Sequence, residues 1–306
     1  LPSAFAGILI SVMVYAIGGG LLEVIVSPVV EACPSDNKEK AMSMLHSFYC
    51  WGHVGVVLLS TVFFFVFGIE NWKIMAVLWA LIPLANAFIF AKVPVPSLIE
   101  EGEQGLSLKE LFGMKMFWIL LIMMVCAGAS EQAVSQWAST FAEKGLRISK
   151  VAGDLAGPMA FAILMGTSRA FYGKYGDRIQ LDRFMRLSCV LCIASYLGIA
   201  FFPTPLFSLI SCAVCGFSVG IMWPGTFSKA AKVLPKGGTA MFALLALGGD
   251  LGCSSGPTVV GAVSSLAGEN LKLGIFAAGI FPVLLLLGIG MCNNVKKERK
   301  GLAWNF

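Results

Sequence analysis

Charged residues are scarce in this sequence. Asp, Glu, Lys and Arg make up 13% of its 306 residues, while hydrophobic residues make up 58%. Soluble domains carry about 25% charged residues, so this composition excludes an ordinary globular domain and is typical of a protein that crosses a membrane many times. The net charge of +5 is spread over several loops instead of forming one basic patch. The sequence therefore does not predict nucleic-acid binding.

Common catalytic motifs are also missing. The sequence contains no phosphate-binding glycine loop, no HExxH and no nucleophile elbow, so it predicts neither ATP-driven transport nor ordinary hydrolase chemistry. Two cysteine pairs have CxxC spacing, Cys189 with Cys192 and Cys212 with Cys215. Both lie in apolar segments without a nearby His or carboxylate, so we interpret them as packing residues. We predict that the protein is not an enzyme and uses no cofactor and no metal.

The hydrophobic residues form long segments separated by short polar connectors. A helix of about 20 apolar residues is long enough to cross a bilayer. We predict nine such helices, at about residues 4–32, 41–67, 74–92, 116–140, 152–172, 186–202, 205–228, 239–265 and 273–292. The predicted fold class is an all-α membrane protein.

The longest connector, residues 94–115, separates three predicted helices from six. Within it, Ser107 and Glu110 have the spacing of a capping box, which predicts a short helix at the membrane surface. We divide the chain into residues 1–93 as the last three helices of an N-terminal bundle, 94–115 as a cytoplasmic linker, 116–295 as a six-helix C-terminal bundle and 296–306 as a cytoplasmic tail.

The basic residues predict the orientation, because cytoplasmic loops carry an excess of Lys and Arg. Over alternate connectors, 17 of the 22 basic residues fall on one side, with Arg169 and Lys229 counted among them. This distribution places the connector at residues 34–40 and the C-terminus in the cytoplasm. We expect a multi-pass protein of the plasma membrane, and a monomer.

A weak internal repeat predicts further helices before Leu1. Gly19, Ser27 and Pro34 match residues of the seventh segment at a constant offset of 201, which pairs the first helix with the seventh as in transporters with parallel repeats. The fourth helix would then have its partner ahead of Leu1, and the chain begins without Met. We expect that nine of twelve helices are present here.

A carboxylate lies inside the first apolar segment. Glu23 follows three glycines, Gly18 to Gly20, with about ten apolar or small residues on either side. A charge near the bilayer centre costs about 2.5–3.5 kcal/mol on insertion scales, so it normally faces a partner or a cavity. Glu23 is therefore interpreted as part of a polar site reached from water; the alternative is a tolerated polar residue near a helix end.

A stripe of polar residues marks the fourth segment. It comprises Glu131, Gln132, Ser135, Gln136 and Ser139, within about two helical turns. This hydrogen-bonding capacity indicates a water-filled path or a polar ligand. Trp137 can place its ring against a sugar, or anchor the helix at the membrane interface.

The eighth segment combines a small-residue stripe with an aspartate. Gly248, Gly252 and Gly256 recur every four residues, a pattern that permits close helix contact. Asp250 lies two residues from this stripe, about 200° around the helix, so it should face a cavity. The alternative is a structural pairing with a neighbouring side chain.

Two histidines, His46 and His53, are seven residues apart on the second segment and so share one helix face. Such a pair can relay protons near neutral pH. It can equally form hydrogen bonds within the bundle.

The connector at residues 173–183 resembles the signature loop of the major facilitator superfamily, roughly G-x-x-x-D-R-x-G-x-R-R. Gly173, Asp177, Arg178 and Arg183 match this pattern, whereas Gln180 replaces a glycine. The resemblance implies that these residues bind neighbouring helix ends and help to gate the conformational change.

Within that superfamily, the first segment resembles the fucose permease group. The stretch from Gly20 to Pro28 is similar to the group's L-E-T-A-A-N-P, with Ser27 in place of asparagine, and Met222 to Ser228 is similar to its aromatic-P-T-x-F-S pattern. The spacing of Glu131 and Trp137 is also similar. The resemblance implies a twelve-helix sugar:proton symporter in which Glu23 is linked to proton and substrate, whereas the group's partner aspartate lies on a helix that this sequence lacks.

These observations predict a secondary active transporter that imports a small polar solute, such as a sugar, with H⁺. Its partners are the solute, the proton and the lipid bilayer. An exporter of drugs or metabolites is the first alternative, and a membrane sensor without transport is the second. We assign coupling to Glu23 and Ser27, and the solute path to Glu131, Gln132, Ser135, Gln136, Trp137, Trp223 and Asp250.

Overall fold

A computed structural model describes residues 4–95, 105–146, 153 and 155–303. These residues form helices joined by turns and contain no strand. The elements are α1 (Ala4–Ala32), α2 (Lys38–Phe67), the 3₁₀ turn η1 (Ile69–Asn71), α3 (Trp72–Phe90), α4 (Leu108–Gly113), α5 (Lys115–Leu146), the π-helical turn η2 (Leu155–Met159), α7 (Ala160–Tyr175), α8 (Leu181–Phe201), α9 (Pro205–Val219), α10 (Met222–Val233), α11 (Gly238–Leu266), α12 (Leu271–Ala278) and α13 (Ile280–Ala303).

The helices agree with the predicted apolar segments in position. In the described part of the chain, seven stretches are long and apolar enough to cross a membrane; α9 with α10 forms one of them, and α12 with α13 another. The segments predicted at 152–172 and 239–265 are not among the seven, although α7 and α11 occupy them. The described part of α7 has only 16 residues, and α11 contains many glycines and serines. The fold class is confirmed, and the count of nine spans stays a prediction.

One predicted segment, 205–228, is not a continuous helix. Helix α9 ends at Val219 and α10 begins at Met222, so backbone polar groups between them are released from the regular helical pattern. Inside a membrane such a break is tolerated where other groups of the protein bind the freed backbone. One of these carbonyl groups, that of Gly220, becomes part of the site described below.

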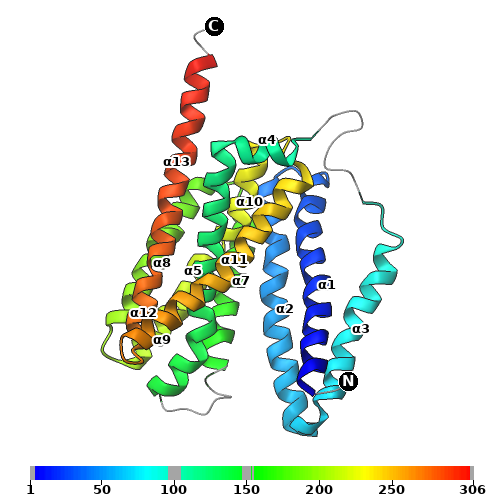
Figure 1. Ribbon diagram of the computed structural model, residues 1–306, viewed down its shortest axis with the longest axis vertical. Coiled ribbons are helices and arrows are strands. Elements are labelled where there is room, and N and C mark those ends of the chain that lie inside the picture. Colours follow the sequence, from blue (N-terminus) through cyan, green and yellow to red (C-terminus); the bar gives the residue numbers. More distant parts are fainter. Residues whose placement is uncertain (1–3, 96–104, 147–152, 154, 304–306) are drawn as a thin grey trace.

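Figure 1 shows α1, α2 and α3 together on one side and the helices from α5 to α13 on the other. Contacts between the two sides run from α1 to α11 and from α2 to α7 and α10. The apolar windows of α1, α2 and α3 bury at most 6% of their residues, against 72% for α5. Apolar side chains exposed in this way are suited to contact with lipid tails. The division of the chain at residues 93 and 115 stays a prediction.

The glycine stripe of α11 packs against α5, as predicted. A Cβ atom added to Gly252 would lie 2.0 Å from the carbonyl oxygen of Val125, and one added to Gly256 would lie 2.5 Å from that of Ala129. Both distances are far below contact distance, so only glycine permits the two backbones to approach this closely.

We expect Gly252→Ala to destabilise the protein by about 1–3 kcal/mol, because the new methyl group must push α5 and α11 apart. The matched control is Gly290→Ala on α13, where no described atom lies within 4 Å of an added Cβ. Thermal unfolding of the purified protein in detergent measures both variants. A melting temperature that is unchanged in Gly252→Ala would show that the helices separate at no cost.

The linker contains the predicted short helix. Ser107 caps α4, and its side chain accepts a hydrogen bond from the backbone of Glu110, whose carboxylate accepts from Ser107 N at 2.8 Å. Hydrogen bonds from the Ser107 side chain and backbone hold the pKa of Glu110 below its usual range. The capping box predicted from the sequence is confirmed.

Candidate functional site

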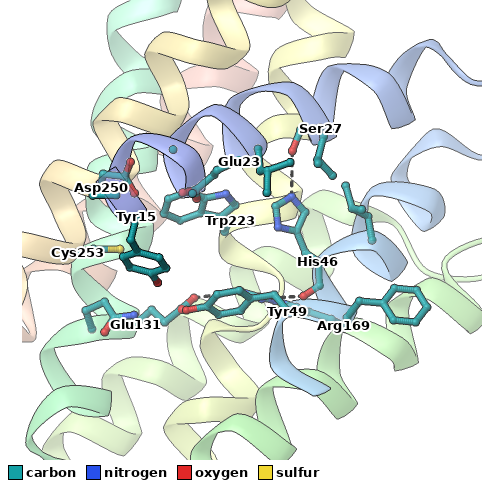
Figure 2. A pocket seen from close by; sticks show the side chains of 18 of the residues that line it. Tyr15, Glu23, Ser27, His46, Tyr49, Glu131, Arg169, Trp223, Asp250 and Cys253 are labelled. Carbon is teal, nitrogen blue, oxygen red and sulfur yellow. Dashed lines mark hydrogen bonds and ion pairs between the residues drawn. The ribbon is translucent and has the colours of Figure 1, made fainter. Parts of the chain in front are cut away.

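A cavity of about 750 Å³ lies between α1 and α2 on one side and α5, α7, α10 and α11 on the other. Figure 2 shows side chains from both sides directed into it. Its polar lining comprises Tyr15, Glu23 and Ser27 of α1, His46 and Tyr49 of α2, Glu131, Gln132 and Gln136 of α5, Arg169 of α7, Trp223 of α10, and Asp250 and Cys253 of α11. This volume is within the range of small-molecule sites.

An ion pair at the cavity wall joins Arg169 to Glu131. Nη2 of Arg169 lies 3.0 Å from Oε2 of Glu131, and both side chains are less than 10% exposed. Arg169 also donates to the carbonyl oxygens of Gly220 (2.8 Å) and His46 (3.0 Å) and to the sulfur of Cys50 (3.2 Å). Buried ions are tolerated when their hydrogen-bonding groups have partners, and each of the three nitrogen atoms of this guanidinium has at least one. Arg169 thereby connects α5, α2 and the break before α10.

The count of basic residues predicts a cytoplasmic loop position for Arg169, and this prediction is wrong. Arg169 is 2% exposed and lies within α7. The sequence contains an indication of this buried position, because Arg169 falls inside the segment predicted to span the membrane at 152–172. An intramembrane cation indicates a buried partner, but the sequence did not show that the partner was Glu131.

Glu23 faces the cavity from α1. Gly19 and Gly20, one turn before it, line the same cavity, and no described atom lies within 4 Å of a Cβ added at either position. Within the described part of the chain, the Glu23 carboxylate has neither a hydrogen bond nor a cationic partner. Asp250 and Glu131 line the same cavity. The interpretation of Glu23 as part of a polar site reached from water stays a prediction.

The two histidines separate in the structure. His46 lines the cavity, its Nε2 lies 3.2 Å from Oγ of Ser27, and its ring stacks on Phe227 at 5.9 Å between centroids. His53 is exposed and does not line this cavity. The structure therefore places one member of the predicted relay at the site and the other outside it.

Asp250 and Trp223 line the cavity from α11 and α10. Asp250 is exposed. Its carboxylate has no hydrogen bond and no cationic partner among the described residues, so the predicted alternative of a structural pairing with a neighbouring side chain is not seen there. Trp223 is 6% exposed, and its Nε1 has no hydrogen-bond partner in the same part of the chain.

Two members of the predicted solute path lie elsewhere. Ser135 and Trp137 are absent from the cavity lining, although Gln132 and Gln136 on the same helix belong to it. Nε1 of Trp137 instead donates to the carbonyl oxygen of Pro257 on α11 at 3.3 Å. Trp137 therefore fills the α5–α11 interface in this conformation.

The CxxC pairs are buried. Cys189, Cys192, Cys212 and Cys215 are free thiols, each at most 1% exposed, in the core between α8 and α9. In the described part of the chain, no group of three or more His, Cys, Asp or Glu residues is arranged to hold a metal ion.

Comparison with known proteins identifies the family. The model of the Major Facilitator Superfamily matches residues 1–257. The chain belongs to the major facilitator superfamily. Members of this superfamily are transporters that carry small solutes across membranes and are generally not enzymes.

Two solved structures of the superfamily have the same fold. The transporter FucP in its outward conformation aligns with a TM-score of 0.79 and 14% identity, over 94% of this chain and 77% of that one. A variant of the E. coli fucose:proton symporter FucP aligns with a TM-score of 0.74 and 15% identity, over the same shares. At these identities the likeness concerns the fold alone.

A sequence relative is the multi-drug resistance efflux pump PmrA homolog of Lactococcus lactis subsp. lactis (strain IL1403). It is 25% identical over 231 residues, which are 72% of this chain and 55% of the relative. The chain thus spans about half the length of the curated relative that it matches.

The superfamily signature loop lies between α7 and α8 and contacts the start of α2. Asp177 accepts a hydrogen bond from Nδ2 of Asn37 at 2.9 Å and forms an ion pair with Lys40. The hydrogen bonds from Lys40 and then from Asn37 hold the pKa of Asp177 below its usual range. Gly173 lies within α7, close to Met44 of α2. The loop therefore touches a neighbouring helix end, as the resemblance implied.

Further polar contacts connect the same end of α2 to α7 and α10. Glu39 accepts a hydrogen bond from the hydroxyl group of Tyr172 at 2.8 Å and is paired with Lys232. Beside these contacts is a second cavity, of about 640 Å³, whose lining includes Arg178. Arg183 lies in the first turn of α8 and is outside this lining.

Proposed function

We propose that this protein is a secondary active transporter that imports a small polar solute, such as a sugar, together with a proton. The observation that carries the proposal is the cavity between the two groups of helices. On one wall is the carboxylate of Glu23, which has no cationic partner among the described residues, and on the other are the polar residues of α5 and α11. A site at the interface of two helix bundles is the usual location in alternating-access transporters. The fold is that of FucP, which is described as a fucose:proton symporter.

Glu23 would couple proton movement to solute movement by alternating between its ionised and protonated forms. Protonation removes a charge whose desolvation is expensive when the bundles close, so the loaded cavity can change its access more readily than the cavity with a bare carboxylate. The membrane potential adds about 2.3 kcal/mol per elementary charge for each 100 mV. Ser27 and His46, which contact each other beside Glu23, would orient the proton or a bridging water molecule.

The remaining assignments concern the path and the gate. Gln132 and Gln136 would bind the solute through their amide groups, while Ser135 and Trp137 would contribute only in another conformation, since neither lines the present cavity. The contacts of Asp177 with Lys40 would close the cytoplasmic end while the solute enters from the opposite side. The predicted orientation, the two bundles and the monomeric state belong to the same proposal.

Export is the second candidate, because the efflux pump of Lactococcus lactis is a sequence relative and a helical cavity does not by itself define direction. A sensor would keep the cavity and lose coupling. Two measurements distinguish importer, exporter and sensor: whether the protein moves the solute at all, and in which direction a proton gradient drives that movement.

Transport by the full-length protein in proteoliposomes tests this proposal. With the vesicle exterior acidified, we expect a sugar of a test panel to accumulate inside, and we expect the accumulation to vanish when a protonophore removes the gradient. Accumulation that occurs only when the vesicle interior is the acidic side would establish proton-coupled export. Binding without movement in either direction would contradict transport and favour the sensor.

A further inference from the structure

The cavity carries more negative charge than proton coupling requires. Among the described residues, three carboxylates line it, those of Glu23, Glu131 and Asp250, against one cationic side chain, Arg169. Arg169 is already paired with Glu131 at 3.0 Å. Neither Glu23 nor Asp250 has a cationic partner within the part of the chain that the structure describes. When a proton occupies Glu23, the charge of Asp250 therefore remains without a cationic partner among the described residues.

The same cavity contains a hydrogen-bond donor that lacks an acceptor. Nε1 of Trp223 is buried without a partner in the described part of the chain, and the residue as a whole is 6% exposed. The six-membered ring of the indole lies against Gly249 of α11. Figure 2 shows the ring among the side chains that line the cavity. A buried N–H group without an acceptor is destabilising, and an oxygen atom of a ligand would satisfy it.

We propose that the solute bound by this cavity carries a protonated amine and at least one hydroxyl group, as an amino sugar does. Asp250 binds the ammonium group, and the N–H group of Trp223 donates to an oxygen of the solute. This inference rests on the transporter function proposed above and names its substrate class. Tyr15 also lines the cavity, and aromatic faces attract cations; the ring of Tyr49 is already occupied by the guanidinium of Arg169, 5.9 Å from its centroid.

Charge balance distinguishes this solute from a neutral sugar or an acid. Asp250 is exposed in this conformation, so water compensates its charge. When the two groups of helices close around the solute, much of that water is lost and an unpaired carboxylate becomes costly. An ammonium group offsets this cost, a neutral hydroxyl group does so only in part, and an anionic solute adds repulsion. The two carboxylates thereby have different roles: Glu23 binds the proton, and Asp250 binds the ammonium group of the solute.

Binding of matched solute pairs to the purified full-length protein tests the proposal by isothermal titration calorimetry. The pairs are glucosamine with glucose and ethanolamine with ethylene glycol, which differ in the amine. A hydrogen-bonded charge pair corresponds to a preference of about tenfold or more, so we expect at least one amine to bind tenfold more tightly than its neutral counterpart. Asp250→Asn should remove this preference while leaving the affinity for the neutral solute within about twofold.

Two further variants separate specific loss from misfolding. Asp36→Asn, an identical change at an exposed position outside both cavities, should keep the amine preference. Trp223→Phe removes the N–H donor and should weaken both members of a pair by the same factor. All variants must elute as the wild type does in size-exclusion chromatography before they are compared.

The outcomes separate this inference from the transporter function. The inference is overturned if no amine binds better than its neutral counterpart, or if Asp250→Asn leaves the preference unchanged. Proton-driven accumulation of a neutral sugar, without an amine preference, would overturn the inference alone. Amine binding that depends on Asp250, without movement in a counterflow assay, would support the inference and contradict transport.

Discussion

Replacement of Glu23 by Gln is expected to abolish proton-driven accumulation of the solute while solute exchange across the membrane continues. Glutamine has nearly the shape of a protonated glutamate but can neither release nor bind the coupled proton. A gradient of one pH unit is worth 1.36 kcal/mol, or about tenfold in solute concentration for one proton per solute. We therefore expect the wild-type protein to approach tenfold accumulation per pH unit and the variant to stop at equal concentrations.

The measurement is uptake into proteoliposomes, made with and without a pH gradient, together with counterflow of labelled solute in the absence of a gradient. Glu70→Gln is the matched control, since Glu70 lies in the exposed turn η1, outside the cavity lining. Undiminished accumulation in Glu23→Gln would show that this residue does not couple proton movement to solute movement. Loss of counterflow as well would point to a defect in solute binding or in folding instead of coupling.

The second large effect is expected at the buried ion pair. Arg169→Met leaves the carboxylate of Glu131 without its partner in the interior, and it also deprives the carbonyl oxygens of Gly220 and His46 of a donor. Removal of one member of a buried pair typically costs about 3–5 kcal/mol. We expect a correspondingly large fall in the melting temperature of the detergent-solubilised protein, and a loss of expression in the membrane.

A double variant distinguishes the effect of the unpaired charge from the effect of the lost hydrogen bonds to the backbone. In Arg169→Met with Glu131→Gln the buried charge is gone, so a substantial part of the stability should return, although the freed carbonyl groups still lack a donor. Arg186→Met, at an exposed position on α8, is the control for the side-chain change itself. If the double variant is no more stable than Arg169→Met alone, the ion pair contributes little, and the hydrogen bonds of Arg169 to the backbone would account for the loss.

The helices were predictable because their cause is local. The first predicted segment, 4–32, coincides with α1, since a long apolar run must satisfy its backbone within itself when it crosses a bilayer. The capping box at Ser107 was equally predictable, because both of its partners lie within one turn. The break between α9 and α10 was missed, although Pro224 marks it: proline has no N–H to donate to the carbonyl group of Gly220, four residues earlier.

Hydrophobic pattern and charge placement alone determined that this chain forms membrane helices and that Glu23, Glu131 and Asp250 lie inside them, since both follow from the cost of polar groups in hydrocarbon. Only the tertiary structure decided which of these acids is neutralised. Glu131 is paired because Arg169, 38 residues away on another helix, reaches it at 3.0 Å, whereas Glu23 and Asp250 face the cavity with no cation beside them in the described part of the chain. Pairing depends on how helices pack against one another, and the sequence pattern of a single helix does not contain that information.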